Sequence, residues 1–177
     1  MTKKKISSPL AILLLTGLIL PIQATHASNP ESPNIIIILA DDMGYSDIGS
    51  FGAEVETPHL DRLAANGLRM SRFYNVARCC PSRAALLTGE YPHTAGMGLM
   101  ADQSIAIPAY QGYLNAETPT LAQRLKKLGY YTSISGKWHV GDEPEHWPHH
   151  YGFDRSFAFI HGASSYFDNR PYRNSEW

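Results

Sequence analysis

Asn34-Ile-Ile-Ile-Ile-Leu-Ala40 is an unbroken, largely β-branched apolar run near the start of the chain. Apolar residues without polar alternation are typical of a central strand that is buried on both faces of a parallel sheet. Two carboxylates, Asp41 and Asp42, follow this run directly. Ligands of open α/β sheets bind beyond the carboxyl ends of the strands. The run therefore predicts the fold class and also one edge of a site.

Helix and strand patterns alternate along the rest of the chain. In order, they predict a helix from Thr57-Pro58 to Asn66, a strand over 68–74, a helix from Pro81 to Thr88, a long ordered loop over 91–115, a helix from Thr118-Pro119 through the stripe Leu121, Leu125 and Leu128, and a strand over 130–135. No strong strand is predicted after Gly141. The alternation predicts an α/β domain with a largely parallel central sheet flanked by helices. Only about three strands are predicted, so the sheet is expected to be incomplete in this chain.

The first 27 residues are predicted to be a secretory signal peptide. Lys3–Lys5 form its basic region, Leu10–Leu20 its apolar core, and Thr25-His26-Ala27 a small-residue cleavage site. The apolar core is shorter than the roughly 20 residues that span a bilayer. We therefore expect a protein exported to the periplasm or the medium with no stable membrane anchor, and a mature chain over residues 28–177.

Charge and cysteine content exclude several functions. The chain has 15 basic and 16 acidic residues, and loss of three lysines with the signal peptide leaves a net charge of −4. That balance argues against nucleic acid as a partner and gives no polybasic membrane patch. The only cysteines are Cys79 and Cys80. Adjacent Cα atoms are about 3.8 Å apart, below the usual disulfide span, so chemistry is a better reason for a cysteine here than a scaffold.

Residues 79–89 read Cys-Cys-Pro-Ser-Arg-Ala-Ala-Leu-Leu-Thr-Gly. Pro81 suits the first helical position and Gly89 the left-handed residue beyond the helix end. Cys79 then lies at the positive end of the helix dipole, where anions and charged nucleophiles are favoured, with Arg83 on the same face. The alternative is a buried, inert cysteine at a helix start.

This run resembles the sulfatase signature, which is Cys-x-Pro-Ser-Arg followed by two residues, two aliphatics, Thr and Gly. The resemblance implies an alkaline phosphatase/sulfatase-like fold, of which residues 28–177 form the amino-terminal part of the catalytic domain. It also implies that Cys79, with Cys80 as the variable residue, is oxidised before folding to formylglycine by a maturation enzyme. The hydrate of that aldehyde is the nucleophile.

Asp41 and Asp42 are predicted metal ligands. Two adjacent carboxylates at a buried strand end repel each other unless a cation or hydrogen bonds compensate, and they suit calcium or magnesium. Paired acids in a loop are otherwise simply solvated. The run Ile-Leu-Ala-Asp-Asp-Met-Gly-Tyr-Ser-Asp resembles the first metal-binding motif of sulfatases. The resemblance implies a divalent cation, Ca²⁺ first and Mg²⁺ as the alternative, held by Asp41, Asp42 and residue 79.

Gly136-Lys137-Trp138-His139 follows the predicted strand over 130–135. In an extended backbone Lys137 and His139 face the same side, where a cation and an imidazole bind an oxyanion and move a proton. The stretch resembles the second sulfatase signature. The resemblance implies that Lys137 contacts formylglycine and sulfate, that His139 hydrogen-bonds the formylglycine hydroxyl, and that Arg83 helps to balance the sulfate charge.

Other candidates carry less weight. None of the remaining histidines has zinc-ligand spacing in a defined element. Asp168-Asn169 matches the residue types of the family's remaining metal ligands. The preceding Ser164–Phe167 has a poor strand pattern, however, so the pair is not predicted to bind the metal.

The resemblance spans residues 34–169 and implies an exported, arylsulfatase-like hydrolase of aryl, small-molecule or carbohydrate sulfate esters. Two alternatives remain open: a formylglycine-dependent phosphonate or phosphate monoester hydrolase, and a truncated, non-catalytic protein. We expect the 177-residue chain alone to leave apolar strand surface uncovered and to show no useful sulfatase activity.

Overall fold

The computed structural model describes residues 32–165 and residue 167. Its helices are α1 (Pro58–Asn66), α2 (Cys79–Thr88) and α3 (Leu121–Lys127), and its strands are β1 (Ser133–Lys137) and β2 (Arg155–Phe159). Short 3-10 helices occupy Tyr45–Asp47, Gly49–Phe51, Ala101–Gln103, Pro108–Tyr110, Pro144–His146 and Pro148–Tyr151. The chain divides into two compact units, Met1–Leu39 and Ala40–Trp177, and all these elements belong to the second.

Two of the sequence predictions fall outside the described residues. These are the signal peptide over 1–27 and the pair Asp168-Asn169. Among the residues that the structure does describe, no helix is both long and apolar enough to cross a membrane.

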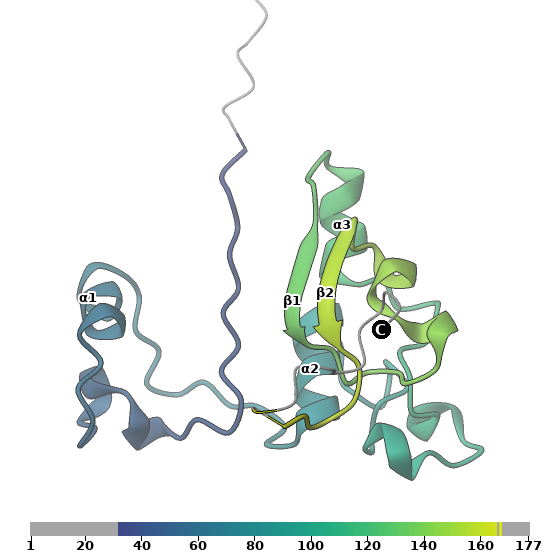
Figure 1. The fold of residues 1–177 in the computed structure, drawn as a ribbon, viewed down its shortest axis with the longest axis horizontal. Coiled ribbons are helices and arrows are strands. Elements are labelled where there is room, and N and C mark those ends of the chain that lie inside the picture. The colour runs from purple at the N-terminus through teal and green to yellow at the C-terminus, as the bar shows by residue number, and fades with distance from the viewer. Residues whose placement is uncertain (1–31, 166, 168–177) are drawn as a thin grey trace, which may run out of the picture. The chain divides into compact units, whose positions relative to one another are not determined.

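The sheet of the second unit is parallel, as predicted. β1 and β2 lie side by side, with Ser133 opposite Arg155 and Lys137 opposite Phe159, so their carboxyl ends meet at one edge (Figure 1). The absence of a strand after Gly141 was a wrong prediction, because β2 lies there. Its sequence, Arg-Ser-Phe-Ala-Phe, is short and half polar, and only pairing with β1 makes it a strand.

The core of the second unit joins the sheet to α2 and to the long loop over 91–115. Its largest fully buried side chains include Trp138, Met97, Leu114 and Ile160, and Cys80 of α2 packs in the same cluster. Burying each large apolar side chain stabilises the fold by about 1.5–3 kcal/mol. The loop was correctly predicted to be ordered, since it contributes two of these core residues.

The strands predicted over residues 34–40 and 68–74 are absent. Neither segment pairs with another strand among the described residues, and their side chains are open to solvent: Ile36 is 81% exposed, Ile38 80% and Leu68 84%. A strand needs a neighbour for its backbone N–H and C=O groups, so apolar, β-branched residues alone do not make one. These apolar side chains are exposed within the described residues, but they belong to no strand.

The three predicted helices form, α1 with the predicted bounds and the other two with shifted ends. α2 begins at Cys79 after Arg78, two residues earlier than predicted, so that Cys79 itself is the first helical residue. α3 begins after Thr120, whose side chain accepts a hydrogen bond from the Gln123 N–H. Leu128, predicted to be part of an apolar stripe, is 73% exposed because the helix has already ended at Lys127.

Replacing the fully buried Thr120 by valine should lower the free energy of unfolding by about 1–3 kcal/mol. The Thr120 hydroxyl donates to the Tyr151 carbonyl at 2.6 Å and caps α3, and valine fills the same space without either bond. Urea unfolding followed by circular dichroism measures the loss, with Thr120→Ser as the control that retains the hydroxyl. Equal stability of the valine and serine variants would contradict this role.

Candidate catalytic and metal centre

Cys79 is the first residue of α2 and lies at the positive end of the helix dipole. Arg78 precedes it with extended backbone, and the helix ends at Gly89, whose φ is 75°. Cys79 is half-buried and is a free thiol. The segment therefore places one chemically reactive side chain at a helix N-terminus, where negative charge is stabilised.

Cys80 has a different environment. It is fully buried, its Sγ accepts a hydrogen bond from the Ala101 N–H at 3.4 Å, and burial raises the pKa of its thiol to about 11. A thiol with so high a pKa is protonated and unreactive at neutral pH. Both cysteines are free, so no vicinal bridge joins them. Of the two neighbours, only Cys79 faces the polar cluster described next.

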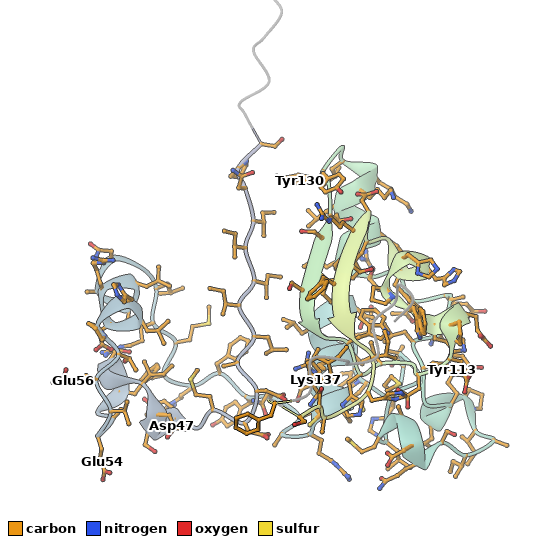
Figure 2. All side chains as sticks on the ribbon, in the orientation of Figure 1. Asp47, Glu54, Glu56, Tyr113, Tyr130 and Lys137 are labelled. Carbon is orange, nitrogen blue, oxygen red and sulfur yellow. The ribbon has the colours of Figure 1, made fainter. Side chains whose placement is uncertain are left out.

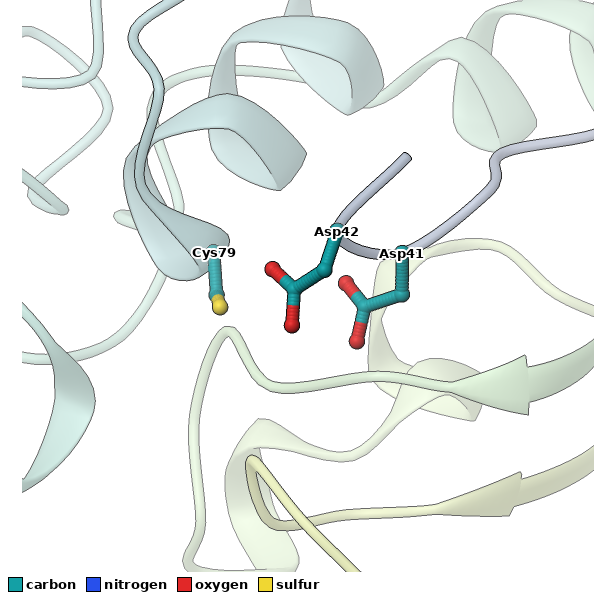
Figure 3. A group of neighbouring side chains, drawn as sticks. All are labelled: Asp41, Asp42 and Cys79. Atoms are coloured by element: carbon teal, nitrogen blue, oxygen red, sulfur yellow. The ribbon is translucent and has the colours of Figure 1, made fainter. Parts of the chain in front are cut away.

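Asp41, Asp42 and Cys79 come together although the acids are 38 and 37 positions from the cysteine in the sequence. One potential ligand atom from each lies within 4.8 Å of the others, and Figure 3 shows the two carboxylates beside the cysteine sulfur. Asp42 has a φ of 54°, in the left-handed region that residues other than glycine seldom adopt. Within the described part of the chain, Asp41, Asp42 and Cys79 are the only group of three or more His, Cys, Asp or Glu residues close enough to share a metal ion.

The donor set suits a hard divalent cation on one condition. Calcium and magnesium prefer oxygen ligands, and the two carboxylates supply them, whereas a thiol sulfur is a soft ligand. The Cys79 Sγ marks the place that a formylglycine oxygen would take after oxidation. With that oxygen the three residues offer hard ligands only, so the residues fit the implied ion when Cys79 is modified.

Two cations lie against Asp41. The Arg83 Nη2 is 3.2 Å from its Oδ1 and the Lys137 Nζ is 2.9 Å from its Oδ2. The hydrogen bond from Lys137, followed by that from Arg83, holds the pKa of the Asp41 carboxyl below its ordinary value in spite of partial burial. Asp41 is therefore ionised at neutral pH. Since each carboxylate oxygen has two lone pairs, it is able to accept these bonds and also to bind a cation.

Arg83 also joins α2 to β1. Its Nη1 donates to the Lys137 carbonyl at 2.7 Å, and its side chain is only 9% exposed. The Nε atom is buried without a hydrogen-bond partner, so its N–H donor is unused. Lys137, at the end of β1, has a side chain that is 6% exposed, and Figure 2 labels it at the carboxyl edge of the strands. Two buried, positively charged side chains thus converge on one carboxylate.

His139 lies beyond the end of β1 in an unexpected conformation. Its φ is 56°, so the extended backbone assumed in predicting that it faces the same side as Lys137 does not continue through it. The side chain is buried, and its Nδ1 has no hydrogen-bond partner. Burial, then the charge of Lys137, lowers the pKa of the imidazole. His139 is accordingly neutral at pH 7 and has one ring nitrogen available.

The structure thus brings Asp41, Asp42 and Cys79 into one group and ties Arg83 and Lys137 to it. His139 lies within electrostatic reach of Lys137 and Arg83. Asp142 was not predicted to be a site residue; its Oδ2 is 3.5 Å from the His161 Nδ1, and its Oδ1 is buried without a hydrogen-bond partner. Its contact with His161 joins the segments that follow β1 and β2, which no local motif predicts.

Comparison with known proteins identifies the family of the chain. The family model described as Sulfatase matches residues 33–177. The arylsulfatase of Klebsiella aerogenes is 41% identical over 171 residues, which are 96% of this chain and 35% of that protein. Human arylsulfatase A is 47% identical over 127 residues, 70% of this chain and 24% of that protein.

A solved structure, that of Ps i-CgsB, is 38% identical with a TM-score of 0.68, and the match covers 76% of this chain and 30% of that one. The same protein has been crystallised with k-i-k-neocarrahexaose. The chain belongs to the sulfatase family. It spans about a third or less of the length of the curated relatives named here.

Proposed function

We propose that the protein hydrolyses sulfate esters, with formylglycine made from Cys79 as the nucleophile and a divalent cation, Ca²⁺ first, held by Asp41, Asp42 and residue 79. The observation that carries the proposal is the convergence of two carboxylates on Cys79 at a helix N-terminus. Arg83 and Lys137 on Asp41 add positive charge beside them. Membership of the sulfatase family supports the reaction class.

The chemistry follows from a geminal diol at position 79. One hydroxyl attacks sulfur, and the bond from sulfur to the ester oxygen breaks, so that the alcohol or phenol leaves with a proton. The second hydroxyl then loses its proton, the carbonyl re-forms, and sulfate departs. A thiol has no second hydroxyl and is unable to complete this last step. A bound cation would lower the pKa of the attacking hydroxyl and help to neutralise the sulfate.

The chain's own residues have separate parts in this proposal. Lys137 and Arg83 are positioned to stabilise the charge that builds on the sulfate oxygens, because they are buried and lie at the group formed by Asp41, Asp42 and Cys79. His139, neutral through burial, is suited to a hydrogen bond with the formylglycine hydroxyl. The substrate is an aryl, small-molecule or carbohydrate sulfate ester, and the protein is exported and depends on a formylglycine-generating enzyme.

Peptide mass spectrometry tests the nucleophile. After expression of the full-length protein with a maturation enzyme, we expect the thiol-to-aldehyde mass loss at Cys79, since only Cys79 has the Cys-x-Pro-Ser-Arg register. Cys79→Ala should abolish turnover of an aryl sulfate, and the matched variant Cys80→Ala should keep most of it. Modification of Cys80 alone, or of neither cysteine, would refute the assignment.

Paired assays test the substrate. The modified protein with Ca²⁺ should hydrolyse an aryl sulfate faster than the corresponding aryl phosphate. The reverse preference would favour a formylglycine-dependent phosphate or phosphonate monoester hydrolase. No turnover of either ester, with formylglycine confirmed, would support the non-catalytic alternative.

A further inference from the structure

Two segments run together beyond the carboxyl ends of β1 and β2. The N–H of Trp138 donates to the Phe159 carbonyl at 3.0 Å, and the N–H of His139 donates to the Ile160 carbonyl at 2.9 Å. Parallel pairing thus continues past the last residues of both strands. It brings residues 160–162 against the segment that carries His139.

The imidazole of His139 lies directly against the backbone of Gly162. A Cβ atom at position 162 would be 2.6 Å from the ring Nε2 and 3.1 Å from Nδ1, and closer still to Cε1. Real Cβ atoms essentially never approach other heavy atoms within 3.0 Å, so the ring would have to move. Because the φ of Gly162 is not in the left-handed region, the residue is needed for space rather than for backbone conformation.

The segment that carries Gly162 is tied to the loop after His139 a second time. The His161 Nδ1 lies 3.5 Å from the Asp142 Oδ2, and this pair joins the residue before Gly162 to a residue three positions after His139. His139, with a left-handed φ and a buried side chain, is therefore enclosed between its own strained backbone and residues 160–162. Residues at functional sites hold such conformations only when their surroundings fix them.

We infer that Gly162 is a positioning residue for His139, because its missing side chain lets residues 160–162 pack against the imidazole and fix the orientation of the ring. The inference rests on the proposed function for its effect on turnover. Its structural part concerns only the His139 ring. A displaced ring would leave the charge-based binding of the substrate largely intact. It would weaken the proposed hydrogen bond between His139 and the formylglycine hydroxyl, and so lower kcat.

Gly162→Ala tests the inference, with Gly98→Ala as the matched control. The φ of Gly98 is not left-handed either, and a Cβ there would be 2.6 Å from both the His93 Cδ2 and the Tyr110 Cε1. The two variants thus introduce the same methyl group against an aromatic ring. Only the first of these rings belongs to His139.

We expect two results for Gly162→Ala in full-length, formylglycine-containing protein. The kcat for an aryl sulfate should fall on the order of tenfold to a hundredfold, with KM within about twofold. In spectra of protein with ¹⁵N-labelled histidine, the ring resonances of His139, assigned with His139→Gln, should shift more than in Gly98→Ala. The control should keep its kcat.

Unchanged His139 resonances and kcat in Gly162→Ala would overturn the inference. An equal loss of kcat in both variants would also overturn it, because the effect would then be general. If the unmutated protein hydrolyses no ester, the proposed function fails, and the resonance comparison still decides whether Gly162 positions the ring.

Discussion

A variant in which Asp41 and Asp42 are both alanine should bind no divalent cation at this site and should lose more than about a thousandfold in sulfate-ester turnover. The two carboxylates are the hard ligands of the group that includes Cys79. Without them a formylglycine oxygen alone would face the cation. Removing two adjacent acids also removes their mutual repulsion, so the fold should remain largely intact.

Calcium titration calorimetry and steady-state kinetics measure these losses. The matched control is the double variant Glu54→Ala, Glu56→Ala, which removes the same charge from two exposed acids (labelled in Figure 2). It should keep both cation binding and turnover. A double Asp variant that retained one bound cation per protein and near-normal turnover would disprove the metal site.

The single variants separate two roles of the acids. Asp41 also accepts hydrogen bonds from Arg83 and Lys137. Asp41→Asn should therefore disturb the positions of these two side chains as well as metal binding. Asp42→Asn should weaken metal binding and leave in place the bonds of Arg83 and Lys137 to Asp41 and the bond of Arg83 to the Lys137 carbonyl.

Replacing Arg83 by methionine should reduce turnover by more than about a hundredfold and lower the free energy of unfolding by about 1–3 kcal/mol. The buried guanidinium donates to the Lys137 carbonyl and to Asp41 at once, and methionine supplies neither bond. Arg83→Lys keeps the charge without the planar fork, so it should lie between methionine and arginine in both measurements.

Urea unfolding and kcat/KM measured on the same preparations distinguish stability from catalysis. Arg124→Met serves as the control, because Arg124 is an exposed arginine whose Nε donates only to the Pro119 carbonyl in the described hydrogen bonds. Should Arg83→Met lose stability while its folded fraction turns over normally, Arg83 would be a structural residue only.

The parts of the site that the sequence predicted rest on local signals. Cys79 belongs to a helix whose start is marked by Pro81 and whose end is marked by Gly89, and α2 forms with its start two residues earlier than predicted. Asp41 and Asp42 follow an apolar run, and the rule that ligands bind beyond strand ends placed them near other site residues. Their approach to Cys79 is seen in the structure although the run itself forms no strand there.

The parts that sequence reasoning missed depend on residues distant in the chain. Strand formation needs a partner, which is why the strongly apolar segment over 34–40 is not a strand while the weakly apolar β2 is. The left-handed φ of His139 similarly defeats an argument from alternation. Gly162 carried no motif, and its contact with the imidazole appears only when two loops are seen together.

The contacts that close the site also determine when it can assemble. Arg83 reaches Asp41 across 42 positions and the Lys137 carbonyl across 54, and Lys137 reaches Asp41 across 96. Closing such long loops has an entropic cost, so contacts of this range form late, after local turns such as those of α2. Before these long-range contacts form, the segment that carries Cys79 is accessible to a modifying enzyme. If Cys79 is oxidised as proposed, the interval before loop closure would be the time available for that reaction, and a variant that folded faster would carry less aldehyde.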